Sequence, residues 1–113
     1  MFIRVFRAQV RPGKQAEFKK CLELLTLPNI EYRSGMVAFY PGQPAGANSD
    51  EFILVTVWRE AAGRTHSGED WAKAIIPPEV LPLLKSFSEQ GYQSFGVNEK
   101  PVSPLFNFQA GTT

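Results

Sequence analysis

Residues 51–58, Glu-Phe-Ile-Leu-Val-Thr-Val-Trp (EFILVTVW), decide the fold of this chain. β-Branched and aromatic residues dominate the stretch, so it predicts a β-strand. Its apolar residues occupy both faces of that strand, which indicates that both faces of the sheet are covered. The chain has 113 residues, which suits one domain with one sheet layer. We therefore expect helices of the same chain on one face and a partner molecule on the other.

The sequence before this strand predicts a strand, a helix and a second strand. Residues 2–11 (FIRVFRAQVR) alternate at a period of two, as a strand does. Residues 14–25 change to helical spacing with one apolar stripe, and Pro28 should end that helix. Residues 33–40 predict another strand, and residues 41–50 a loop rich in Pro and Gly.

The sequence after residue 58 predicts helices and a last strand. Residues 59–88 contain helical pieces, one starting at Glu69 and another near Pro78. Gly91 is a plausible end for the second, and residues 92–97 (YQSFGV) predict a strand. The order is βαββαβ, an α+β ferredoxin-like unit whose antiparallel sheet carries its helices on one face.

The domain is expected to span residues 1–98 and to be followed by a tail over 99–113. The tail contains Leu105, Phe106 and Phe108, more apolar groups than a disordered segment usually carries. We therefore expect it to pack on the domain or on the partner subunit.

The composition excludes several classes of protein. The net charge is +1 with no basic block, so nucleic acid is not an expected partner. No signal-peptide segment is visible, and no apolar run approaches the ~20 residues of a membrane span. One cysteine, Cys21, allows no internal disulfide and suits a cytoplasmic protein. One histidine and no cysteine pair argue against a metal site based on histidine.

Several segments, in this order and spacing, resemble the antibiotic biosynthesis monooxygenase family. They are RPGK (11–14), AEF (16–18), VTVW (55–58), GEDW (68–71) and IPPE (76–79). The resemblance covers about residues 2–97. It implies a homodimer in which two ferredoxin-like sheets pack face to face as a dimeric α/β barrel, with the helices outside. The activities it implies are oxygenation of aromatic quinol-type polyketides without metal or flavin, quinol oxidation, and haem degradation.

Two departures from the family argue against haem degradation. The position of the haem-ligating histidine falls near Ile75, and that of a first-strand asparagine near Phe6. Both residues here are apolar, so we expect no cofactor. Binding of another flat apolar molecule stays open.

His66 is the candidate acid/base residue, because an unperturbed imidazole suits proton abstraction from a phenol or quinol. The alternative is an exposed loop histidine. Trp58, Trp71 and Tyr92 are candidate pocket aromatics that would bind a flat substrate, whereas the alternative for Trp58 is a core or interface position. The proposed cavity wall between sheet and helices consists of Phe6, Met36, Ala38, Trp71, Ile75, Leu84 and Tyr92.

Two arginines and the cysteine can be explained by structural roles. Arg4 and Arg7 lie on opposite faces of the first strand, and either could hold a carboxylate or a phenolate. A surface position is the commoner outcome for such an arginine. Cys21 lies beside the apolar stripe of the first helix and is expected to be a small core residue.

The sequence thus leaves three functions open. The leading hypothesis is a cofactor-independent monooxygenase that acts on a small aromatic or quinol-type substrate. The alternative is a non-catalytic dimer of the same fold that binds a small apolar or aromatic molecule. A third possibility is a structural dimer with a closed core and no cavity.

Overall fold

The structure, a computed structural model, describes residues 1–46, 49–59 and 69–96. Four strands form one sheet, and helices pack against it. The strands are β1 (Phe2–Val10), β2 (Met36–Gly42), β3 (Glu51–Trp58) and β4 (Leu84–Gln93). The helical segments are α1 (Gln15–Cys21), the π-helical η1 (Leu22–Thr26), α2 (Leu27–Ile30), α4 (Glu69–Ile75) and the short 3₁₀ η2 (Leu81–Leu83).

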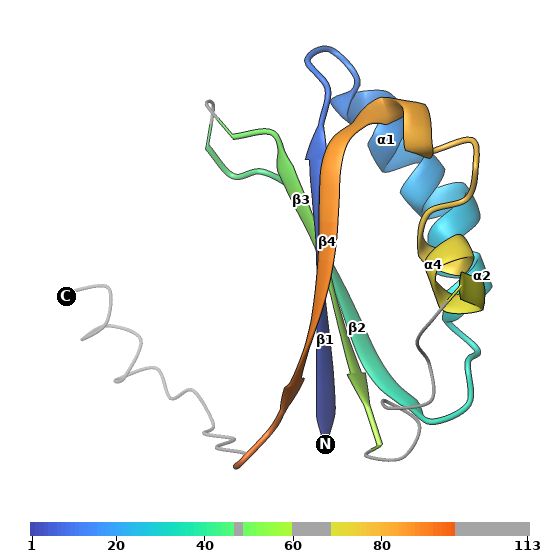
Figure 1. The fold of residues 1–113 in the computed structure, drawn as a ribbon, viewed down its shortest axis with the longest axis vertical. Helices are drawn as coiled ribbons and strands as arrows, with labels where there is room; N and C mark the ends of the chain where they lie inside the picture. The colour runs from blue at the N-terminus through green and yellow to red at the C-terminus, as the bar shows by residue number, and fades with distance from the viewer. Residues whose placement is uncertain (47–48, 60–68, 97–113) are drawn as a thin grey trace, which may run out of the picture.

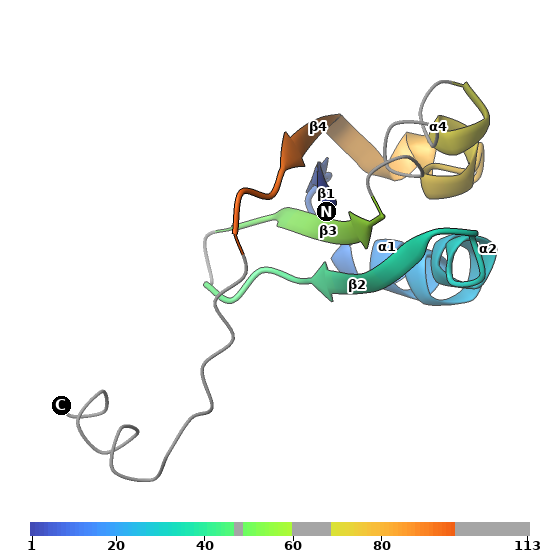
Figure 2. The ribbon, with the colours of Figure 1, turned by 90° about the horizontal axis from the view of Figure 1, so that it is seen from below.

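The sheet is antiparallel throughout, with strand order β2-β3-β1-β4. Helices α1, α2 and α4 all lie on one side of it (Figures 1 and 2). The predicted βαββαβ order and ferredoxin-like fold are therefore confirmed. The strand predicted at residues 51–58 matches β3 to the residue.

The two faces of the sheet differ in burial. Along β3, Phe52, Leu54, Thr56 and Trp58 are buried toward the helices, and Glu51, Ile53, Val55 and Val57 are partly exposed on the other face. On the buried side, the rings of Phe18 (α1) and Phe52 meet edge to face, 4.9 Å apart. The described part of the chain covers only the helix side, so the cover predicted for the second face is not supplied by these residues.

The first helical stretch does not end at Pro28, contrary to the prediction. It continues through η1 and α2 to Ile30. The Leu27 N–H bonds to the Leu22 carbonyl five residues back, so the turn is wider than an α-turn. Pro28 then stands in the first turn of α2, where its missing N–H and its ring cost least.

The second strand also ends later than predicted. Pro41 and Gly42, assigned to a loop, pair with Leu54 and Ile53 of β3. β2 is one of the two edge strands of this sheet, and an edge strand tolerates a proline because one of its sides has no partner that needs the N–H.

The helix predicted from near Pro78 is wrong. Only the short η2 forms there, and residues 84–93 are the last strand instead of residues 92–97. β4 pairs with β1 over almost its whole length. Gly91, predicted as a helix stop, lies inside β4, where a Cβ atom would come within 2.6 Å of Cζ of Phe2. Long-range pairing thus overrides the helical spacing of the local sequence.

A buried hydroxyl fixes α4 against the first helical stretch. Thr26 is fully buried, and its hydroxyl donates a hydrogen bond of 2.9 Å to the carbonyl oxygen of Ile75, the last residue of α4. That carbonyl lies at a helix C-terminus, where backbone oxygens lack intrahelical partners.

We expect Thr26→Val to lower the free energy of unfolding by about 1–2 kcal/mol, because it leaves the buried carbonyl of Ile75 unsatisfied. Urea unfolding followed by circular dichroism measures the change. Thr26→Ser, which keeps the hydroxyl and loses a methyl group, is the matched control. A valine variant as stable as the wild type would contradict this assignment.

The tail predicted over residues 99–113 lies outside the described residues. The prediction that it packs on the domain or on a partner remains a prediction. Within the described ranges, no helix combines the length and the apolar character needed to cross a membrane.

Candidate functional site

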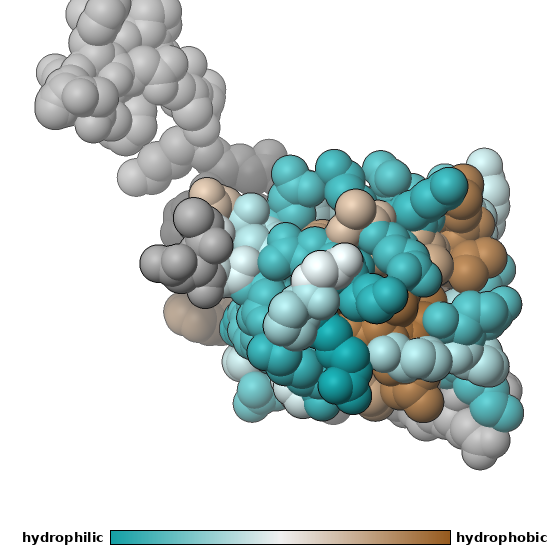
Figure 3. Space-filling model, turned by 90° about the horizontal axis from the view of Figure 1, so that it is seen from above, coloured by the Kyte–Doolittle hydropathy of each residue, from teal (hydrophilic) through white to brown (hydrophobic). Residues whose placement is uncertain are grey.

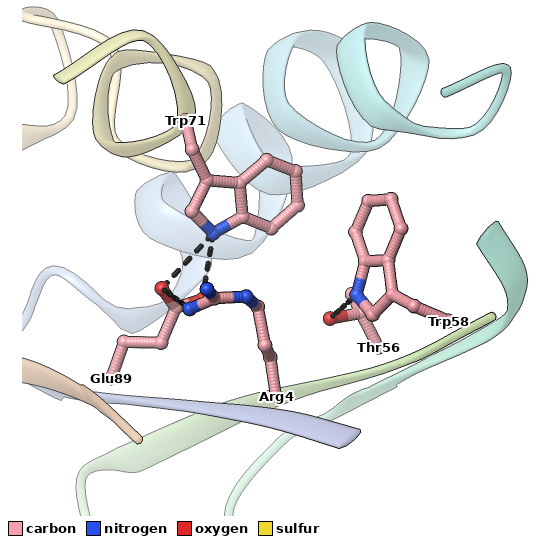
Figure 4. Close-up of polar contacts among 5 residues, drawn as sticks. All are labelled: Arg4, Thr56, Trp58, Trp71 and Glu89. Carbon is pink, nitrogen blue, oxygen red and sulfur yellow. Dashed lines mark hydrogen bonds and ion pairs between the residues drawn. The ribbon is translucent and has the colours of Figure 1, made fainter. Parts of the chain in front are cut away.

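Two tryptophans meet between the sheet and α4. Trp58 ends β3 and is fully buried, and Trp71 on α4 is almost so. Their rings pack edge to face, with centroids 5.2 Å apart and an interplanar angle of 79°. The indole N–H of Trp58 donates to the hydroxyl of Thr56 at 2.8 Å, so the buried polar atom is satisfied (Figure 4).

A partly buried ion pair lies beside Trp71. Arg4 of β1 contacts Glu89 of β4 at 3.1 Å, and their side chains are only 12% and 20% exposed. The indole N–H of Trp71 points at the same carboxylate, 3.0 Å from Oε1 and 2.9 Å from Oε2 (Figure 4). The guanidinium of Arg33 lies 5.8 Å from the centre of the Trp71 ring, within cation–π range. Arg4 from β1 and Trp71 from α4 thus hold the carboxylate of Glu89 in place.

A small cavity opens next to this carboxylate, between α4 and β4. We call it the α4–β4 cavity. Its lining residues are Phe6, Ala72, Ile75, Ile76, Phe87, Ser88 and Glu89, and its volume is about 90 Å³. An engineered apolar cavity of about 150 Å³ holds benzene, so this one matches part of a single aromatic ring. Phe87, one of its lining residues, is 49% exposed.

The structure brings together some of the residues predicted from the sequence. Phe6 and Ile75 line the α4–β4 cavity, and Trp71 holds its carboxylate. Trp58 packs behind Trp71, and Met36, partly buried, packs against the same core. The buried core also includes Trp58, Phe6 and Ile75. For Trp58, a core position was the alternative to a place in a binding pocket.

Other predicted residues lie elsewhere. Tyr92 pairs with Ile3 and is 43% exposed, so it lies on the face of the sheet away from the helices. Ala38 is on that same face, and Leu84 is a core residue. His66 lies outside the described residues, so its role remains a prediction.

Sequence reasoning missed Glu89 and Phe87, because residues 78–91 were predicted to be helical. Residues 84–93 (LKSFSEQGYQ) carry no clear alternation of apolar and polar residues that would have revealed the strand. Read as a strand, Phe87, Glu89 and Gly91 share one face, and Ser88 and Gln90 the other. Arg4 was identified as a possible carboxylate holder, and its partner proves to be a carboxylate of the chain itself.

Larger hollows occur on the surface along the first helical stretch. One of about 290 Å³ lies between η1 and the end of β2, and one of about 400 Å³ lies beside α1. Both are lined by exposed Lys19 and Gln43 as well as by Phe52. Figure 3 views the molecule from the end where β3 begins, and that surface is largely hydrophilic with some hydrophobic atoms showing. Their linings include no charged side chain that is partly buried and held by two partners, as Glu89 is.

The described residues contain no group of three His, Cys, Asp or Glu side chains arranged to hold a metal ion. Cys21, the free thiol, is partly buried and packs against the core, as predicted. Arg7, on the opposite face from Arg4, contacts the carboxylate of Glu51 at 3.4 Å near the surface.

Comparison with known proteins gives matches among solved structures alone. No family model matches the sequence, and no curated protein does. A protein of Deinococcus radiodurans, named as a candidate antibiotic biosynthesis monooxygenase, aligns with a TM-score of 0.69 at 13% identity, over 90% of this chain and 100% of that one. A protein of Nitrosomonas europaea with the same description aligns with a TM-score of 0.65 at 16% identity, over 85% of this chain and 100% of that one.

A third similar structure is a mutant of MhuD with two manganese protoporphyrin IX molecules bound per active site. It gives a TM-score of 0.64 at 15% identity, over 88% of this chain and 100% of that one. All three identities are low, so these matches define the fold. The chain has the ferredoxin-like fold of the antibiotic biosynthesis monooxygenases, the resemblance that its sequence motifs indicated.

Proposed function

We propose that this protein is a cofactor-independent monooxygenase that acts on a small aromatic or quinol-type substrate. The observation that supports the proposal best is the α4–β4 cavity, whose walls are mostly apolar and whose lining includes Glu89, a carboxylate held by Arg4 and Trp71. A closed structural core, the third possibility, predicts no such space. The similarity in fold to proteins named as monooxygenases adds support.

This reaction requires few groups from the protein. A deprotonated quinol gives its own electrons to dioxygen, so the protein supplies an apolar enclosure, a proton acceptor and exclusion of bulk water. Phe6, Ile75 and Ile76 provide apolar walls. We assign the proton acceptor to His66, on the pKa of a free imidazole.

We expect His66→Ala to lower kcat about 100-fold or more and to change KM little, because general base catalysis contributes in the reaction step. Oxygen uptake with a panel of substituted hydroquinones measures both constants. Ile75→Trp, which fills the α4–β4 cavity, should instead abolish uptake through loss of binding. Full turnover by the His66 variant would remove this histidine from the mechanism.

A non-catalytic binding protein is the second candidate. It is favoured by the observation that the described residues lining the cavity include one charged group, Glu89, already paired with Arg4. Such a protein would bind an aromatic ligand stoichiometrically and consume no oxygen. The same uptake assay, run beside a binding titration, separates the two functions.

We further propose that the protein acts as a homodimer in the cytoplasm. The side chains of Ile3, Val5, Ile53, Val55 and Val57 share the sheet face that carries no helix. They are only partly buried, and a continuous apolar patch of this kind is typical of an interface. A second copy placed face to face would cover it. The single free cysteine suits a reducing compartment.

A further inference from the structure

We propose that Glu89 determines the specificity of the α4–β4 cavity by selecting aromatic ligands that carry a hydroxyl group. The inference rests on the proposed function, because it takes the cavity as the binding site. It goes further by naming the residue that binds the ligand, Glu89, and the ligand group that it recognises, a hydroxyl.

Two side chains from other elements fix the position of the Glu89 carboxylate. Arg4 contacts one carboxylate oxygen, and the Trp71 N–H is within hydrogen-bond distance of both. Arg4 comes from β1 and Trp71 from α4, so two elements beside its own strand fix the position of the carboxylate (Figure 4). Such a preorganised group loses little conformational freedom when a ligand binds.

The carboxylate keeps acceptor capacity for a ligand. An ionised carboxylate offers about four lone-pair sites. Among the described residues, Arg4 and Trp71 are its two hydrogen-bond partners, each with one donor atom in contact. A ligand hydroxyl can therefore donate to Glu89 without displacing either of them.

The other cavity walls strengthen this preference. Phe6, Ala72, Ile75, Ile76 and Phe87 are apolar, and Ser88 belongs to the opposite face of β4. Glu89 is thus the one charged side chain among the described lining residues. A hydroxyl that enters finds a charged acceptor, which gives a strong hydrogen bond. A ligand carboxylate meets like charge and an arginine that is already paired.

The ion pair is better explained by recognition than by stability. A partly buried Arg–Glu pair often adds no more stability than apolar side chains of similar volume would. Here it joins β1 to β4 beside the α4–β4 cavity. Ligand sites are typically apolar with a small number of placed polar groups.

Three probes of similar size test the inference: 4-fluorophenol, 4-fluorotoluene and 4-fluorobenzoate. They differ in carrying a hydroxyl, a methyl or a carboxylate on the same ring, and ¹⁹F NMR titration of the full chain measures each affinity. We expect 4-fluorophenol to bind about ten-fold or more tightly than 4-fluorotoluene. 4-Fluorobenzoate should bind most weakly.

Glu89→Gln should remove most of the preference for the phenol while leaving 4-fluorotoluene affinity within about two-fold, because a neutral amide is a weaker acceptor. Glu31→Gln, which makes the same change at an exposed glutamate outside the cavity lining, is the control and should not change the preference. Trp71→Phe removes one of the two contacts that fix Glu89, so the preference for the phenol should shrink, and this variant keeps the inference testable if Glu89→Gln fails to fold.

The outcomes separate this inference from the proposed function. If 4-fluorotoluene and 4-fluorophenol bind equally, and Ile75→Trp blocks both, the cavity is the site and only the role of Glu89 is overturned. If an unchanged preference survives both Glu89→Gln and Trp71→Phe, the role of Glu89 is again overturned. If Ile75→Trp affects no ligand, the cavity is not the site and both proposals fail.

Discussion

Trp58→Ala should lower the free energy of unfolding by about 3–5 kcal/mol, a large part of the stability of a domain this size. Trp58 is fully buried at the end of β3, so truncation leaves a cavity that its neighbours cannot fill completely. It also removes the edge-to-face partner of Trp71, 5.2 Å away. Chemical unfolding at fixed protein concentration, followed by circular dichroism, measures the loss.

A hydrogen bond contributes part of this effect and can be separated from packing. The indole N–H of Trp58 donates to Thr56, itself buried, at 2.8 Å. Trp58→Phe keeps an aromatic ring but leaves that hydroxyl without its donor, so we expect a smaller loss of about 1–3 kcal/mol. Adding Thr56→Val to Trp58→Phe removes both polar partners and should recover part of the stability.

A loss below about 1 kcal/mol for Trp58→Ala would contradict the packing seen here. It would mean that the ring is not part of a close-packed core, and the helix–sheet space would then be looser than the structure describes. No recovery in the double variant would mean that the hydroxyl of Thr56 finds another partner once the indole is gone.

In the proposed face-to-face dimer, Val55→Lys should shift the protein to the monomer at micromolar concentration. Val55 lies opposite Val5 on β1 and Tyr40 on β2, near the middle of the face that carries no helix. In a two-fold symmetric dimer each subunit presents the same patch, so both lysines would enter the same interface. Burying unpaired charge costs several kcal/mol, and the dissociation constant should rise about 100-fold or more.

Sedimentation velocity on both proteins measures this effect. Leu24→Lys is the matched control, because Leu24 is 63% exposed on the helical side, and it should remain dimeric. A monomeric wild type would contradict the dimer directly. A Val55 variant with the wild-type dissociation constant would show that the subunits associate through another surface.

The sequence predicted the elements whose patterning is local. Residues 51–58 carry enough β-branched and aromatic side chains to define a strand wherever they are placed, and β3 has those limits. The helical stripe with Phe18 and Leu22 is likewise buried as expected, because its spacing sets its inner face.

The sequence was least informative where non-local contacts decide. Around residues 78–91, apolar spacing suggested a helix, but pairing with β1 makes residues 84–93 a strand. Pro28 was predicted to end a helix and Pro41 to lie in a loop. A widened helical turn accommodates Pro28, and the position of β2 at a sheet edge accommodates Pro41. Local propensities are small, and tertiary pairing energies exceed them.

The candidate site shows the same division. The sequence predicted an apolar, aromatic-rich space between sheet and helices. The residues predicted to line it include Phe6, Trp58, Trp71 and Ile75. That a carboxylate from residue 89 would be held there by Arg4 was decided by tertiary structure alone. The reason is physical: composition and periodicity specify which face of each element avoids water, but only strand order and register bring residues 4 and 89 to neighbouring positions.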